Sequence, residues 1–143
     1  MSSLRTASVV LDTNVALDLL VFFDPSTQAM QMALADGTLQ WLTTLEMRQE
    51  FERVLAYPRI TRHLQRQGIQ ASERMERFDT LTQQVERAAP SGLRCTDPDD
   101  QMFIDLVLAH RALLLSKDAA VLALRKRLAV QGVAVCSFMP AVA

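Results

Sequence analysis

Short apolar runs alternate with longer amphipathic segments along most of this chain. The first run, Val9-Val10-Leu11, ends at Asp12, and a helical spacing of apolar residues begins at Val15. Short runs bounded by turn residues are typical of buried strands. The same pattern predicts five strands, at 8–11, 39–42, 93–95, 113–115 and 133–136.

The segments between these runs have the period of helices that bury one face. Ser26 is expected to cap the second helix, and Thr43 or Thr44 is expected to cap the third. Pro58 is expected to stop that third helix, and Gly68 to interrupt the polar helical segment after it. The predicted helices cover 14–22, 26–35, 44–56, most of 59–89, a segment containing 103–111, and 121–128.

Strands that alternate with helices predict an α/β fold with a central, mainly parallel, twisted sheet. Right-handed crossovers would place the carboxyl ends of the strands at one edge of the sheet, where such folds bind ligands. The chain has 143 residues, half of them hydrophobic, which is enough for one core. We therefore predict a single domain over residues 1–143, built as a three-layer α/β/α sandwich.

The net charge and the cysteine content indicate which ligands and which cellular compartment suit this chain. A net charge of −1 argues against a non-specific nucleic-acid binder, and the use of arginine for 13 of the 15 basic residues is best explained by a GC-rich genome. Cys95 and Cys136 form no metal or disulfide pattern and suit a reducing cytosol. Because no leader sequence or membrane-spanning stretch is evident, a cytoplasmic protein is expected.

Four carboxylates stand out by their positions. Asp12 and Asp118 each follow a predicted strand. Asp100 opens a helix, and Glu50 lies at the border of another helix's apolar stripe. Clustered carboxylates repel one another unless a cation neutralises them, and a ligand set of oxygens alone suits Mg²⁺ or Mn²⁺. Together the four acids predict a metal site.

Each of these acids also has a simpler interpretation. Asp12, Asp100 and Asp118 precede helices, where aspartate is a common N-cap, and taken singly this is the preferred interpretation. Glu50 alone is typical of a solvated helix residue. Only the four acids taken together favour the metal site.

Other ionisable residues are assigned more modest roles. Asp97 and Asp99 are expected in a loop from which either reaches the same site. His63 and His110 have no metal-ligand spacing and are expected at the surface.

Four motifs occur in an order that resembles the PIN domain family, over nearly the whole chain. They are V-V-L-D-T-N at 9–14, Q-E-F-E-R-V-L-A-Y-P-R at 49–59, D-P-D-D-Q-M-F at 97–103 and L-S-K-D at 115–118. The chain is most similar to small prokaryotic PIN proteins described as toxin components of toxin–antitoxin systems. Gln101 stands where close relatives often have an acid.

The resemblance implies a divalent-metal-dependent nuclease, usually acting on RNA through in-line attack of water, with a 5′-phosphate product. Ser116 would place its hydroxyl beside the metal, and Asn14 would hold the turn after Asp12. The resemblance assigns both catalysis and Mg²⁺ or Mn²⁺ binding to Asp12, Glu50, Asp100 and Asp118.

Arginines follow the second motif and have two interpretations. Arg59, Arg62 and Arg66 would form a basic rim that holds the RNA backbone. The alternative is a solvated helical face whose ion pairs neutralise these arginines, and for any single arginine it is slightly preferred. The further arginines are Arg74 and Arg77, and the candidate acidic partners are Glu52, Glu73, Glu76 and Asp79.

Three functions compete at this point. The leading one is a metal-dependent RNA endonuclease, the toxin of a pair held inactive by an antitoxin protein. The alternative is a non-catalytic module of the same fold that binds RNA or protein. An aspartyl phosphotransfer domain built on Asp12 is disfavoured, because no Asp-x-Asp-x-Thr pattern follows the first strand. Apolar residues in the early helices predict a homodimer or higher oligomer: Phe22, Phe23, Met30 and Met32.

Overall fold

The computed structural model describes residues 6–139, and its centre is a five-stranded sheet in which every neighbouring pair is parallel. The strand order is β3-β2-β1-β4-β5. The strands are β1 (Ala7–Leu11), β2 (Leu39–Thr43), β3 (Thr82–Gln84), β4 (Leu113–Leu115) and β5 (Val135–Cys136). The expected parallel α/β sheet is confirmed.

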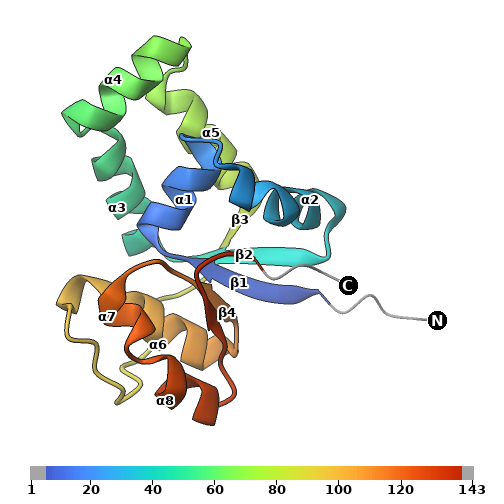
Figure 1. Cartoon of the computed structure of the whole chain (residues 1–143), viewed down its shortest axis with the longest axis vertical. Coiled ribbons are helices and arrows are strands. Elements are labelled where there is room, and N and C mark those ends of the chain that lie inside the picture. The colour runs from blue at the N-terminus through green and yellow to red at the C-terminus, as the bar shows by residue number, and fades with distance from the viewer. Residues whose placement is uncertain (1–5, 140–143) are drawn as a thin grey trace.

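Helices cover both faces of this sheet and complete three layers (Figure 1). One face carries α1 (Thr13–Leu20), α2 (Gln28–Asp36), α3 (Leu45–Leu55), α4 (Pro58–Gln67) and α5 (Ala71–Leu81). The other carries α6 (Gln101–His110), α7 (Ala119–Leu122) and α8 (Arg125–Val130). Two 3₁₀ turns, η1 (Pro25–Thr27) and η2 (Pro98–Asp100), precede α2 and α6.

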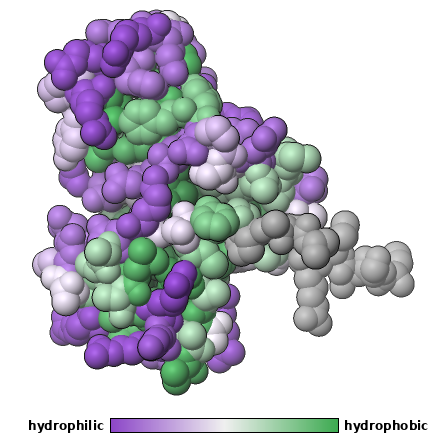
Figure 2. All heavy atoms as spheres, in the orientation of Figure 1, coloured by the Kyte–Doolittle hydropathy of each residue, from purple (hydrophilic) through white to green (hydrophobic). Residues whose placement is uncertain are grey.

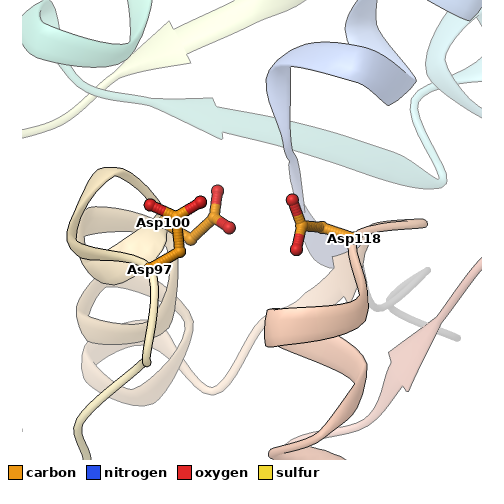
Figure 3. Close-up of side chains that lie close together, drawn as sticks. All are labelled: Asp97, Asp100 and Asp118. Carbon is orange, nitrogen blue, oxygen red and sulfur yellow. The ribbon is translucent and has the colours of Figure 1, made fainter.

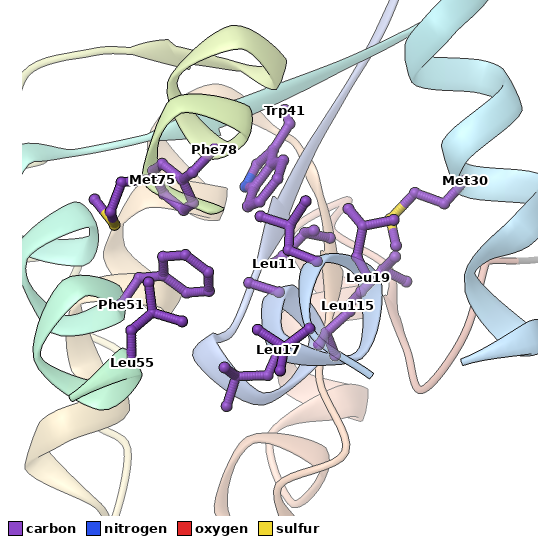
Figure 4. Packing of buried hydrophobic residues seen from close by; sticks show 14 of the residues in the cluster. Leu11, Leu17, Leu19, Met30, Trp41, Phe51, Leu55, Met75, Phe78 and Leu115 are labelled. Atoms are coloured by element: carbon purple, nitrogen blue, oxygen red, sulfur yellow. The ribbon is translucent and has the colours of Figure 1, made fainter. Parts of the chain in front are cut away.

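Successive side chains of β1 point to opposite faces of the sheet, and the core is divided into two halves accordingly. Val9 and Leu11 pack with α1–α5, while Val10 packs with α6–α8. The first half contains an aromatic cluster in which Phe78 lies edge-on to Trp41 and stacks on Phe51, both with ring centroids 4.9 Å apart (Figure 4). Phe51 lies on α3 next to Glu50, so this cluster also positions the helix that carries the second motif.

One predicted strand is wrong. Leu93–Cys95 is irregular, because the Gln101 side chain takes its backbone groups: Gln101 Oε1 accepts from the Cys95 N–H at 2.8 Å, and Gln101 Nε2 donates to the Leu93 carbonyl at 2.7 Å. The strand beside β2 is instead Thr82–Gln84, within the segment predicted as mostly helical. It is polar because it lies at the sheet edge, so it has no hydrophobic pattern to reveal it.

The helix boundaries largely follow the predicted caps, with three differences. Thr44 caps α3 as expected, but the Asp24 side chain caps η1 and Ser26 caps nothing. Pro58 begins α4 at its first position, where proline's missing N–H costs nothing. The predicted helix over 121–128 is divided into α7 and α8.

The outer surface separates into two lobes, α3–α5 and α6–α8, with hydrophilic side chains along the waist between them (Figure 2). Within residues 6–139, no helix is both long enough and apolar enough to cross a membrane.

Candidate metal centre

The candidate centre begins where the neighbouring strands β1 and β4 end side by side. The Asp12 N–H donates to the Leu115 carbonyl at 3.1 Å, and the Ser116 N–H donates to the Cys136 carbonyl at 2.9 Å. These bonds continue the sheet by one residue beyond β1 and β4. Asp12, Ser116 and Asp118 are therefore placed at the carboxyl edge by the strands themselves.

Asp12 is almost fully buried, with 3% of its surface exposed. Its Oδ1 accepts from the Val15 N–H at 2.9 Å, which caps α1, and its Oδ2 accepts from the buried Ser116 hydroxyl. Burial raises the pKa of Asp12, although the bonds from Ser116 and Val15 oppose this shift. The carboxylate is thus held in one orientation at the floor of the site.

Ser116 links the first and last acidic motifs. Its hydroxyl donates to Asp12 and accepts from the Asp118 N–H at 3.1 Å. Because Ser116 is fully buried, this bridge fixes the position of Asp118 relative to Asp12. Ser116 therefore contributes to the site by positioning the two aspartates.

Three carboxylates come together above this floor. Asp97, Asp100 and Asp118 each offer one oxygen, and these oxygens lie within 4.8 Å of one another. Asp97 and Asp100 project from the turn that begins α6, and Asp118 faces them from the start of α7 (Figure 3). Of the two loop acids expected to be able to reach this site, Asp97 belongs to the group, whereas Asp99 does not.

Helix capping accounts for some of these acids but not for Asp100. Asp12, Asp97 and Asp118 each use one oxygen to cap a helix or 3₁₀ turn. Asp100 occupies the N-cap position of α6 but makes no side-chain capping bond. Its Oδ2 is buried and has no hydrogen-bond partner among residues 6–139. A buried unpartnered carboxylate oxygen is costly, and a bound cation would satisfy it.

Glu50 reaches the same site from α3. It accepts a hydrogen bond from the Thr13 hydroxyl at the start of α1. Asp12, Glu50, Asp100 and Asp118 all line one pocket of about 320 Å³. The four acids singled out in the sequence therefore share one cavity, although they come from four separate elements.

The electrostatics of the pocket show an excess of negative charge. Burial, together with repulsion from Asp118, Asp97 and Asp12, raises the pKa of Asp100 from 3.8 to about 7. Arg59 lies on the pocket wall as its one basic residue within the described chain. Carboxylate oxygens, one of them orphaned, are a donor set that fits a hard divalent cation such as Mg²⁺ or Mn²⁺.

Other predicted residues lie around the pocket or away from it. Asn14 is exposed on the pocket wall, but its side chain makes no hydrogen bond in the described structure that would hold the turn; the Asp12 cap does that instead. His110 is exposed as expected. His63 is half-buried, with its ring edge-on to Phe22, because apolar contacts take its ring out of solvent.

The arginines divide into different roles. Arg74 donates to the Leu20 carbonyl at 3.1 Å and lies over the Phe23 ring, so it stabilises the α1–α5 contact. Arg62 and Arg66 line a separate open depression on α4. The expected ion pairs with acids of the same face do not form in the described structure, where Asp79 pairs with Arg48 instead.

Two pocket residues were missed in the sequence. Thr13 anchors Glu50, and Tyr57, half-exposed, lines the pocket beside Arg59. Both stand inside the quoted motifs, so their position was available. Their part in the pocket could not be predicted, because a single hydroxyl or aromatic residue has neither a hydrophobic period nor a charge that points to a site.

Comparison with known proteins identifies the class. The family model of the PIN domain matches residues 8–120, which is more than half of the chain. The chain belongs to the PIN domain family, whose members are generally nucleases that use a divalent metal. No curated protein matches the chain.

Proposed function

We propose that this protein is a Mg²⁺- or Mn²⁺-dependent endoribonuclease that hydrolyses RNA phosphodiester bonds. One observation carries the proposal: four carboxylates from separate elements line one pocket, and the orphaned oxygen of Asp100 is buried there. In this proposal residues 1–143 form one domain.

Asp12, Glu50, Asp100 and Asp118 would hold the cation, with Asp97 beside them. The cation would activate water and stabilise negative charge on the phosphoryl group. Ser116 orients Asp12 and Asp118 through its two hydrogen bonds. Thr13 holds Glu50 toward the same point. These contacts set the carboxylates before substrate arrives, which lowers the cost of organising the site.

The pocket wall supports single-stranded RNA as the substrate. Arg59 offers a guanidinium for a backbone phosphate, and Tyr57 offers a half-exposed ring on which an unstacked base can lie. Leu17, Val54 and Ile60 complete an apolar wall. Arg62 and Arg66 would contact RNA farther along α4.

The toxin role, an antitoxin partner and a cytoplasmic location are part of the same proposal, supported by the family resemblance of the motifs. A homodimer is supported by exposed apolar residues on the early elements. Of the four residues that suggested it, Phe23 and Met32 are 43% and 66% exposed, whereas Met30 is buried.

The proposal is tested with the purified protein and a labelled single-stranded RNA. Cleavage is expected with Mn²⁺ and not with EDTA, and the products should carry a 5′-phosphate, detected by digestion with a 5′-phosphate-dependent exonuclease. RNA binding without cleavage at millimolar Mn²⁺ would instead support a non-catalytic binding module and overturn the enzyme proposal.

The raised pKa of Asp100 makes a separate prediction about stability and pH. The folded protein holds this proton up to about pH 7, whereas the unfolded chain releases it near pH 3.8. The metal-free protein is therefore expected to lose stability as pH rises between these values. Bound Mn²⁺ would compensate the ionised carboxylates, so the gain in Tm on adding Mn²⁺ should be larger at pH 8 than at pH 5.5.

Thermal unfolding with and without Mn²⁺ at the two pH values measures this effect. Asp100→Asn, which cannot ionise, is the matched variant and should lose most of the pH dependence. Equal gains in Tm at both pH values in the unmodified protein would contradict the assignment of Asp100 to the cation.

A further inference from the structure

A second cleft, of about 350 Å³, adjoins the acidic pocket on the other side of Glu50. Glu50 lines both cavities. The walls of the second cleft come from α3, from the irregular segment after β3, and from η2 and the start of α6. A strand of RNA that crosses Glu50 would therefore pass from the acidic pocket directly into this cleft.

Two arginines are the only cations of this cleft within the described chain. Arg53 projects from the last turn of α3, and Arg87 from the irregular segment. Neither forms an ion pair among residues 6–139, although carboxylates lie in the same cleft. Their planar forks of N–H donors are thus available to a ligand.

The acids of the cleft fall into two groups. Asp105 is held in place through Oδ1, which accepts from the Ser91 N–H, the Ser91 hydroxyl and Gln101 Nε2. Glu50 is bound by Thr13. Glu46 and Asp99 make no side-chain acceptor contact in the described structure, so they remain as acceptors for a ligand's N–H groups. Ala88, Pro98 and Met102 provide apolar surface between them.

This combination fits a nucleobase better than a bare phosphate. A phosphate would be repelled by the two available carboxylates, whereas a base that has both acceptors and donors would use both kinds of group. Guanine has two acceptors, O6 and N7, on the edge that an arginine fork recognises. It also has the N1–H and N2–H₂ donors on its other edge, which carboxylates accept.

We infer that the second cleft is a guanine-binding subsite that directs cleavage to phosphodiester bonds next to guanosine. Arg53 and Arg87 are specificity-determining residues for the acceptor edge, and Glu46 and Asp99 for the donor edge. The inference rests on the proposed ribonuclease function, because it supplies the sequence preference of that reaction.

Binding of free nucleotides tests the subsite without relying on cleavage. The metal-free Asp12→Asn protein is titrated separately with GMP, AMP, CMP and UMP, and binding is measured by calorimetry. GMP is expected to bind about tenfold more tightly than AMP, as a bidentate arginine contact discriminates between bases. Equal binding of all four nucleotides would show that the cleft reads only the phosphate and would overturn the inference.

Matched variants separate charge from base recognition. Arg53→Lys and Arg87→Lys keep the charge but lose the fork, so both should lose most of the GMP preference. Arg127→Ala, an exposed arginine on α8, is the control and should keep it. If the preference for GMP persists in both lysine variants, the two arginines do not recognise the base.

Cleavage mapping links the subsite to the reaction. In an RNA that contains a single guanosine, the wild-type protein should cut next to that guanosine. Inosine lacks the N2 amino group, so replacing the guanosine by inosine should reduce the preference for this position. If GMP binds selectively but no RNA is cut, the ribonuclease proposal fails and the subsite stands. If RNA is cut at every base equally, the subsite fails and the ribonuclease stands.

Discussion

Replacing Asp12 by Asn is expected to lower metal-dependent RNA cleavage by about a hundredfold or more without unfolding the protein. Loss of a group that only supports a metal ligand costs about 10–100-fold, and Asp12 is placed among the ligands themselves. The substitution removes a negative charge at the floor of the pocket, so the affinity for Mn²⁺ should fall together with the rate.

The fold should tolerate this change because the amide can keep both contacts of the carboxylate, the one to Ser116 with its direction reversed. Asn Oδ1 can still accept from the Val15 N–H, and the amide nitrogen can donate to the Ser116 hydroxyl, whose own proton then turns away. Burial raises the pKa of Asp12, which means that its ionised form is costly in the folded state. The metal-free variant should therefore unfold at an equal or higher temperature at pH 8.

Cleavage rates, Mn²⁺ titrations and thermal unfolding on the same preparations measure these effects. Asp36→Asn is the matched control, since Asp36 is an exposed residue at the end of α2 that can keep its bond to Thr38 as an amide. Its activity should equal that of the unmodified protein. Cleavage that survives both EDTA and Asp12→Asn would contradict a metal mechanism.

Replacing Phe51 by Ala is expected to destabilise the protein by about 3–5 kcal/mol, the usual cost of truncating a buried aromatic side chain. Phe51 is 1% exposed, and its ring stacks on Phe78. The substitution leaves a cavity between α3, α5 and β2, which the rigid sheet cannot close. For a domain of this size the expected fall in Tm is about 10–17 °C.

Denaturant and thermal unfolding measure this loss. Leu45→Ala on the same helix is the control, because Leu45 is 48% exposed and its truncation should change stability by no more than about 0.5 kcal/mol. A similar loss in both variants would mean that the aromatic cluster does not carry the stability of this half of the core.

Most of the fold could be predicted because its central elements follow from local pattern. The run that ends at Leu11 is apolar on both sides, as a strand covered by helices on both faces must be. The placement of Asp12 and Asp118 followed from the same rule, since parallel strands present their carboxyl ends at one edge. Thr82–Gln84 could not be found in this way, because an edge strand needs no apolar side chains.

The candidate site was only partly accessible from the sequence. Asp97 joined the carboxylate group through the turn before α6, whereas Asp99, two residues later, faces the second cleft. Such a separation depends on the backbone path of a short turn and not on residue type. The Arg48–Asp79 pair likewise joins α3 to α5 and could not be read from spacing within one helix.

The alternation of strands and helices and the position of acids at strand ends follow from local pattern, because they depend on contacts between near neighbours along the chain. The orphaned buried oxygen of Asp100 and the position of Glu50 between two cavities emerge only in the packed molecule. The contact of Gln101 with the Leu93–Cys95 loop is of the same kind. Burial, hydrogen-bond satisfaction and repulsion between charges arise only when elements distant in the chain pack together.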